Sequence, residues 1–263
     1  MNFLDTIISD KRAEVNARSR TTPLAVVEQH ARKNAVRNFV AALSMEGTRV
    51  IAELKAHTPT IASFPASHQL EDLAPVYERN GACAISVVVD EKRFGTSLRL
   101  VTKIRHRVSL PVLVKEFVID PYQIFEARAA GADAILLIAR LLDADKLATF
   151  VDLAHNLRMT ALVEVHDEFD IDRASRSGAR VIGINNRDLD RMVVSLDTSR
   201  RLLPQMPEDC VRVCESGIST RADVEELALL GANAFLVGGA ILSAQRPAEK
   251  LCELIGPQSR RAE

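Results

Sequence analysis

Charged side chains stand at or near the carboxyl ends of several short apolar runs in this sequence. They are Glu53, Lys55, Lys115, Glu164 and Glu215. Glutamate and lysine can give and take protons, and each changes the proton affinity of a charged neighbour. A further polar residue, Asn185, ends another run. If the fold brings these run ends together, the residues form an acid–base centre.

Eight apolar runs of five to eight residues must position these groups. Most do not alternate between apolar and polar residues, which is typical of parallel strands buried on both faces. Helical patterns separate the runs, and one of them, Pro121–Ala130, follows Asp120, a good N-cap. The other clear helical patterns are Asp143–Leu157, Asp167–Ser177 and Thr220–Leu230. The runs are Val50–Lys55, Ala82–Val89, Pro111–Lys115, Asp133–Ala139, Thr160–Val165, Arg180–Asn185, Val211–Glu215 and Ala234–Gly238.

Eight strand–helix units in series predict an α/β fold, the (β/α)8 TIM barrel. Its usual length of about 250 residues fits this chain of 263. A doubly wound open sheet is the alternative, although such sheets usually have about five or six strands. Residues 1–49 precede the first strand and contain two helical patterns, around Phe3–Ile8 and Val36–Leu43, with a polar loop predicted at Arg18–Pro23. We therefore expect one domain, residues 1–263, with residues 1–49 as an N-terminal helical extension.

Side-chain alternation indicates where the charges of the first strand point. Glu53 and Lys55 share a face with Ile51, so we expect them to face the barrel axis. The intervening residues, which we expect to face the helices, are Val50, Ala52 and Leu54. A charge inside a barrel is unfavourable unless it is paired with an opposite charge or takes part in binding or catalysis. Ordinary ion pairs would explain any single residue. The shared position at the carboxyl ends of strands, where barrel enzymes hold their active sites, favours a catalytic centre.

Small residues follow the last two strands as Ser216-Gly217 and Gly238-Gly239. Glycine allows backbone N–H groups to approach an anion closely, and barrels often bind phosphate at these two loops. Turn formation alone would explain either pair. Together they predict a phosphate site.

The composition narrows the class of partner and compartment. Lys plus Arg number 34 and Asp plus Glu 35, a net charge of -1, so we expect no nucleic-acid partner. No run of 18 apolar residues occurs and the N-terminus does not resemble a signal peptide, so we expect a cytoplasmic protein without membrane contact. The four cysteines lack metal-ligand spacing, so we expect no metal site. Three of them lie in or beside apolar runs, which predicts buried free thiols in a reducing compartment.

These features resemble the indole-3-glycerol-phosphate synthase family over about Phe3–Leu254, nearly the whole chain. The N-terminal helical extension is also similar to that family's. The motifs that carry the resemblance are Ile51–Lys55, Asp90–Ser97, Lys115–Gln123, Ala127–Asp133, Leu162–His166, Gly183–Leu189 and Glu215–Ile218.

The resemblance implies a carboxy-lyase of tryptophan biosynthesis that works without a cofactor. The implied reaction closes a ring in 1-(2-carboxyphenylamino)-1-deoxyribulose 5-phosphate and gives indole-3-glycerol phosphate, carbon dioxide and water. The implied partner is this small phosphorylated substrate. The protein is expected to be a monomer or homodimer, with other tryptophan-pathway enzymes as candidate partners.

The resemblance also implies a role for each charged residue. Lys115 is expected to be the general acid of ring closure, with a pKa lowered by burial or by Lys55. Glu164 is expected to be the acid or base of dehydration and rearomatisation. Lys55 is expected to stabilise developing charge and steer the substrate's anionic groups. Glu53 is expected to transfer protons or to fix Lys115.

Further residues are implied to hold the substrate. Asn185 and Glu215 are expected to hydrogen-bond sugar hydroxyls and orient the lysines. Arg187 is expected to pair with the substrate carboxylate, and Phe117 to line the pocket of the aromatic ring. In the loop after Lys55, Thr58 and Thr60 keep hydroxyls where the family has serines.

The sequence departs from the family pattern at two places. Ala56 replaces a basic residue in the loop after Lys55, and Gly239 replaces a residue that is often polar. Loss of one cation weakens anion binding by about 1 kcal/mol at a partly exposed site. Two alternatives therefore stay open: a paralogous phosphosugar-barrel enzyme with altered substrate or low activity, and a weakly active barrel that serves as a partner scaffold. The scaffold predicts loss of the site charges, which this sequence retains.

Four residues bear on other interpretations of the site. Phosphoribosylanthranilate isomerase uses a Cys and Asp pair, whereas the first strand here carries Glu53 and Lys55, so that function is disfavoured. His166 follows the fifth strand, and because nothing in the sequence pairs it with a nucleophile we expect a structural or surface role. Cys214 precedes Glu215 and is expected to face the helices.

Overall fold

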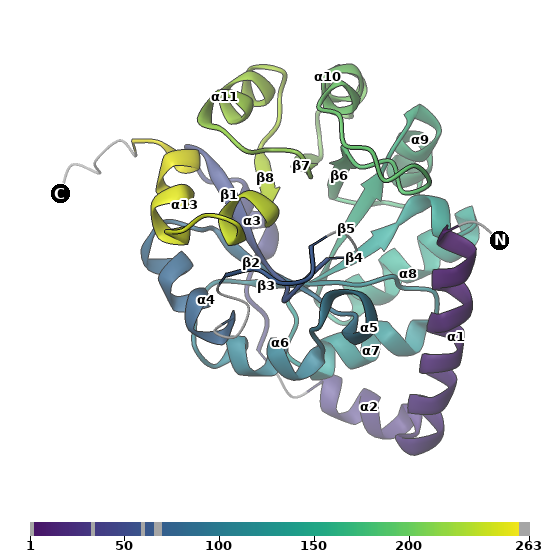
Figure 1. Ribbon diagram of the computed structural model, residues 1–263. Helices are drawn as coiled ribbons and strands as arrows, with labels where there is room; N and C mark the ends of the chain where they lie inside the picture. Colours follow the sequence, from purple (N-terminus) through teal and green to yellow (C-terminus); the bar gives the residue numbers. More distant parts are fainter. Residues whose placement is uncertain (1–2, 33–34, 59–60, 66–69, 258–263) are drawn as a thin grey trace.

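Eight parallel strands pair in chain order, and β8 pairs with β1 to close a barrel (Figure 1). The computed structural model describes residues 3–32, 35–58, 61–65 and 70–257. Every predicted run coincides with a strand whose ends lie within two residues of the prediction. The TIM barrel is therefore confirmed, and the open sheet is wrong. The strands are β1 Arg49–Leu54, β2 Ala84–Val88, β3 Val112–Lys115, β4 Ala134–Ile138, β5 Thr160–Val165, β6 Val181–Asn185, β7 Val211–Glu215 and β8 Ala234–Val237.

Helices surround the barrel, and α7 begins at the capping residue that the sequence predicted. The Asp120 side chain accepts from the backbone N–H of Tyr122, and Gln123 completes a capping box at the start of α7. The helices are α1 Phe3–Thr21, α2 Leu24–Ala31, α3 Phe39–Leu43, α4 Leu70–Arg79, α5 Glu91–Phe94, α6 Leu98–Arg105, α7 Pro121–Ala129, α8 Ala144–Asn156, α9 Glu168–Arg176, α10 Asp197–Leu202, α11 Arg221–Leu229, α12 Gly239–Leu242 and α13 Pro247–Ile255. Two 3₁₀ turns are η2 Ala139–Leu141 and η3 Leu203–Gln205.

Two apolar layers fix which strand residues reach the barrel axis. The layer between strands and helices contains Val50, Ala52, Leu54 and Cys214, as alternation predicts. The layer inside the barrel contains one residue from each odd-numbered strand, namely Ile51, Leu113, Leu162 and Val213. Two residues further along, the same strands carry Glu53, Lys115, Glu164 and Glu215. The charges thus form one layer of four side chains from alternate strands, the usual arrangement of barrel interiors, directly above an apolar layer.

The N-terminal segment lies against the barrel. Helix α1 and helix α2 lie beside α7 (Figure 1), and Phe39 and Leu43 of α3 join the apolar layer inside the barrel. The predicted loop at Arg18–Pro23 is wrong, because α1 continues to Thr21. Arg18 is part of this helix, and its Nε lies 3.0 Å from Glu126 Oε1 on α7.

The remaining compositional expectations can be compared with the structure. All four cysteines are free, and Cys83, Cys210 and Cys214 are buried. Cys252 is exposed. Within the described residues, no group of three or more His, Cys, Asp or Glu could hold a metal ion. No helix in the described part of the chain is long and apolar enough to cross a membrane.

Candidate active site

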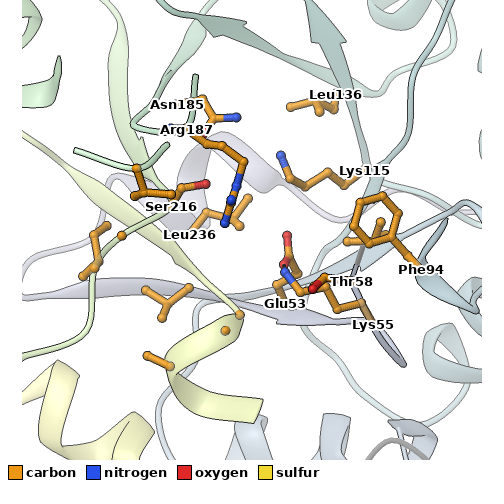
Figure 2. Close-up of a pocket in the computed structure, with 18 of the residues that line it drawn as sticks. Glu53, Lys55, Thr58, Phe94, Lys115, Leu136, Asn185, Arg187, Ser216 and Leu236 are labelled. Atoms are coloured by element: carbon orange, nitrogen blue, oxygen red, sulfur yellow. Dashed lines mark hydrogen bonds and ion pairs between the residues drawn. The ribbon is translucent and has the colours of Figure 1, made fainter. Parts of the chain in front are cut away.

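A cavity of about 500 Å³ opens at the carboxyl ends of the strands. Twelve of the thirteen predicted site residues line it, and Figure 2 shows Lys115, Asn185 and Arg187 pointing into a common space. They are Glu53, Lys55, Thr58, Lys115, Phe117, Glu164, Asn185, Arg187, Ser216, Gly217, Gly238 and Gly239. Glu215 is the exception: it is fully buried behind Lys115. Thr60 lies outside the described residues.

Lys115 is held between two buried carboxylates. Its Nζ donates to Glu164 Oε2 at 3.0 Å and to Glu215 Oε2 at 2.8 Å. Burial lowers the pKa of Lys115, but the charges of Glu164, Glu215 and Glu53 together raise it well above its ordinary value. The expected lowering of this pKa is therefore wrong, because three carboxylates outweigh both desolvation and the single cation Lys55. Lys115 is a protonated ammonium group.

The two carboxylates beside Lys115 differ in proton affinity. Burial favours the protonated form of Glu164, but Lys115, His166 and Asn185 hold its pKa below the ordinary value. Burial and the nearby charges of Glu164 and Glu53 raise the pKa of Glu215 to about 7, despite the opposing effect of Lys115. At neutral pH the site therefore combines an ionised carboxylate with one that exchanges its proton readily, and such a contrast is a mark of acid–base centres.

A second ion pair lies across the cavity. Lys55 Nζ donates to Glu53 Oε1, and both residues come from the end of β1. The Glu53 side chain is buried, whereas that of Lys55 is 15% exposed. Lys55 thus presents a cation at the mouth of the cavity, where it can contact an anionic substrate.

The loop after β1 is tied to the loop after β2. The backbone N–H groups of Ala56 and His57 donate to the Phe94 carbonyl at 2.9 and 3.3 Å. Thr58 and Phe94 both line the cavity. These contacts hold the Lys55 loop, including its unusual Ala56, against the site.

The backbone after β7 and β8 is shaped by close packing. Ser216 and Gly217 both have positive φ, +65° and +80°. A Cβ on Gly217 would lie 2.7 Å from Val194 Cγ1, and one on Gly238 would overlap the Glu53 carboxylate. Glycine is required at both positions, whereas Gly239, the first residue of α12, has open space around it. The loops after β7 and β8 therefore leave their backbone accessible to a ligand in the cavity.

Several apolar residues that the sequence analysis did not select also line the cavity. They are Phe64, Phe94, Leu136, Ile138 and Leu236. Phe94 belongs to the Asp90–Ser97 motif, and Leu136 and Ile138 occupy alternate positions of β4, so strand alternation carried the signal. A cavity lined by both apolar residues and cations suits a substrate that joins an aromatic ring to anionic groups.

Gly183 is a second position that the sequence analysis did not select. It pairs with Glu164 in the register of β5 and β6, and a Cβ there would overlap the Glu215 carboxylate and lie 3.1 Å from Leu162 Cδ1. A glycine inside a strand often marks such a close approach. Glu215 therefore reaches Lys115 only because Gly183 has no side chain.

The variant Gly183→Ala is expected to lower kcat by about 10- to 100-fold, because a displacement of about 1 Å in a catalytic group has effects on this scale. Steady-state kinetics would measure the loss, and thermal unfolding would establish that the variant folds. A kcat within about twofold of wild type would contradict the packing argument.

The fold and site define a (β/α)8-barrel enzyme with a buried acid–base centre at the carboxyl ends of its strands. A family model for indole-3-glycerol phosphate synthase matches residues 4–254, and the chain belongs to that family. The predicted family, carboxy-lyase class and place in tryptophan biosynthesis are confirmed.

Curated relatives match along the whole chain. The indole-3-glycerol phosphate synthase of Polaromonas sp. (strain JS666 / ATCC BAA-500) is 42% identical over 260 residues, covering 97% of this chain and 98% of that protein. The synthase of Parafrankia sp. (strain EAN1pec) is 40% identical over 256 residues, covering 97% and 96%.

Two solved structures share the fold alone. Thiamine phosphate pyrophosphorylase from Pyrococcus furiosus has a TM-score of 0.60 at 16% identity and covers 82% of this chain and 96% of its own. The 3-hexulose-6-phosphate synthase from Salmonella typhimurium has a TM-score of 0.62 at 17% identity and covers 78% and 95%.

Proposed function

We propose that the charged layer at the strand ends carries out the ring closure of 1-(2-carboxyphenylamino)-1-deoxyribulose 5-phosphate to indole-3-glycerol phosphate. The observation that carries this proposal is the ion pairing of Lys115 with Glu164 and Glu215, which favours its ammonium form. The cavity beside it is lined by apolar residues and cations, which suits an aromatic, anionic substrate. The reaction needs an acid at the ketone oxygen, a base for a ring proton, and cations for a carboxylate and a phosphate.

Lys115 acts in the first step. As the ring carbon that bears the carboxyl group bonds to the ketone carbon, Lys115 Nζ gives a proton to the ketone oxygen. Carbon dioxide then leaves and restores the aromatic ring. Three surrounding carboxylates favour the ammonium form of Lys115, so the proton is in place when substrate binds.

Glu164 acts in the later steps. Lys115, reprotonated through Glu215, gives a proton to the hydroxyl group formed by ring closure, which then leaves as water. A proton also leaves the new five-membered ring. Glu164 is ionised at neutral pH because its pKa is lowered, so it is able to take that ring proton. Glu215, with a pKa of about 7, orients Lys115 and exchanges protons with it. Glu53 holds Lys55.

The remaining lining residues bind the substrate. Lys55 and Arg187 face its anionic groups, and the backbone at Ser216-Gly217 and Gly238-Gly239 receives the phosphate. Asn185 and Thr58 hydrogen-bond sugar hydroxyls, and Phe117 packs on the aromatic ring. Arg187 is oriented for this role, because its backbone N–H donates to Asn185 Oδ1 at 3.0 Å.

Purified protein mixed with the carboxyphenylamino-deoxyribulose phosphate should produce indole fluorescence. Well-folded protein that gives no signal at high enzyme concentration would overturn the proposal and favour a paralogue with another substrate. Rescue of a tryptophan auxotroph that lacks the synthase would test the same activity in cells.

We further propose that the chain acts as one domain in the cytoplasm, as a monomer or homodimer, with other enzymes of the pathway as candidate partners. Three buried free thiols and a biosynthetic family support a reducing compartment. The joint apolar layer of α3 and the strands supports a single domain. Light scattering on the purified chain would distinguish monomer from dimer.

Glu215→Gln is expected to raise the free energy of unfolding by up to about 3 kcal/mol at about pH 8, with little change near pH 4. Burial raises the folded-state pKa of Glu215 from 4.5 to about 7. Its contribution to stability is therefore fully present below the unfolded pKa and is lost as the pH rises through about 7. Glutamine removes the unfavourable buried charge, and Lys115 keeps Glu164 as an ion-pair partner.

Urea unfolding at both pH values measures this difference. A variant that is less stable than wild type at the higher pH would contradict the assigned cause. The same variant is expected to lose activity, because Glu215 orients Lys115.

A further inference from the structure

His166 lies directly behind the catalytic carboxylate Glu164. It follows the last residue of β5, is only 7% exposed, and does not line the cavity. Its Nε2 is 3.5 Å from Glu164 Oε1, and its Nδ1 is 3.8 Å from Asp170 Oδ2 on α9. A surface position is therefore wrong for His166, and its ring separates two buried carboxylates.

Buried polar atoms without a partner meet at this point. Within the described residues, neither ring nitrogen of His166 has a hydrogen bond, and neither does Glu164 Oε1. Glu164 Oε2 is bound to Lys115, and the Asn185 amide also lowers the pKa of Glu164, yet no hydrogen bond of normal geometry reaches Oε1. Because buried polar groups are nearly always paired, the imidazole N–H facing Oε1 is the natural donor to it.

The far side of the imidazole is fixed by a second carboxylate. Asp170 Oδ2 accepts from the His166 backbone N–H at 3.1 Å. Two arginines face Asp170: Arg140 Nε lies 3.7 Å from Oδ2, and an Arg173 guanidinium nitrogen lies 3.9 Å from Oδ1. Asp170 is therefore held in place and limits the orientations of the ring. An imidazole between two carboxylates donates to one of them when neutral and to both when protonated.

We propose that His166 is a positioning residue for Glu164, whose proposed catalytic role this inference assumes. Its Nε2–H donates to Oε1, fixes the orientation of the carboxylate and favours its ionised form. Lys115 holds one oxygen and His166 the other, so the carboxylate is restrained on both sides. In this role His166 keeps its own proton, and the proton lost by the substrate ring moves to Glu164.

The variants His166→Leu and His166→Gln separate this role from simple packing. Leucine fills the space but donates no hydrogen bond, whereas the glutamine amide nitrogen reaches about as far as Nε2. His166→Leu is expected to lower kcat by about 10- to 100-fold, the scale of one hydrogen bond to a charged group, with KM changed by less than about twofold. His166→Gln should retain kcat within about threefold of wild type. His155→Leu, at an exposed position of α8, is the matched control and should change neither constant.

The pH profile gives a readout that packing alone would not move. His166 is one of the neighbours that lower the pKa of Glu164. Loss of the donor should raise the pKa of Glu164, so the acidic limb of the kcat profile should move to higher pH in His166→Leu. In His166→Gln it should stay closer to wild type. Asp170, Arg140, Arg173 and Lys115 remain as in wild type, so the shift is assigned to the imidazole.

The double variant Glu164→Gln/His166→Leu completes the test. Because His166 acts through Glu164, the double variant should be no slower than Glu164→Gln alone. His166→Leu with wild-type kcat and pH profile, or a double variant tenfold slower than Glu164→Gln, would overturn the inference while leaving the role of Glu164 intact. If His166→Leu does not fold, a His166→Gln variant that folds but loses activity to the level of Glu164→Gln would also overturn it. Wild-type activity in Glu164→Gln would overturn the proposed role of Glu164 and the inference with it.

Discussion

Lys115→Met is expected to lower kcat by about 10³-fold, within the range that general acid catalysis contributes. Methionine keeps most of the side-chain length but cannot protonate the ketone oxygen. The loss should appear in kcat more than in KM, because proton transfer belongs to the transition state rather than to substrate binding. Indole fluorescence under steady-state conditions measures both constants.

The control for this variant is Lys146→Met. Lys146 is an exposed lysine on α8, with a side chain 60% accessible and 3.8 Å from Asp143, so its replacement should leave kcat unchanged. Lys115→Met also leaves Glu164 and Glu215 without their cation. We expect them to take up protons rather than to unfold the barrel, which thermal unfolding would monitor. A folded Lys115→Met variant with kcat within tenfold of wild type would refute the assignment of the acid.

Glu164→Gln is expected to lower kcat by about 10²- to 10⁴-fold with little change in KM. Glutamine has the same shape but cannot take the ring proton. If Glu164 acts after ring closure, carbon dioxide should still be released in a single turnover, before the indole signal rises. Quenched-flow measurement of carbon dioxide beside stopped-flow fluorescence would detect this separation.

Glu168→Gln is the matched control for Glu164→Gln. Glu168 lies at the start of α9, and its half-exposed side chain pairs with Arg201. Its kinetics should equal those of wild type. Parallel loss of the carbon dioxide and indole signals in Glu164→Gln would instead assign Glu164 to ring closure.

The strands and the faces of their side chains were predictable because both follow from short-range patterns. Continuous apolar runs mark strands buried on both faces. Because side chains alternate along a strand, Glu53 points inward while Leu54 faces the helices. The sequence predicted turns or phosphate contacts at the glycines after β7 and β8. The contacts with Val194 and Glu53 that require glycine at Gly217 and Gly238 come from the tertiary structure. The loop wrongly predicted at Arg18 shows the limit of local patterns: the polar stretch continues as a helix in which Arg18 contacts Glu126, 108 residues away.

The sequence by itself thus determined the barrel, the family, and which side chains stand at the strand ends. The tertiary structure decided their mutual distances, and through them their chemistry. Lys115 meets Glu164 and Glu215 across sequence separations of 49 and 100 residues. Closure of the barrel places β3, β5 and β7 in one layer, and Gly183 leaves the room that Glu215 needs. The pKa of Lys115 rises rather than falls because a charge responds to every neighbour within several ångströms, whatever its place in the chain. The tertiary structure also decided that His166 lies behind Glu164. The sequence does not show that these two buried groups lack hydrogen-bond partners and face each other, because that depends on the distance between them.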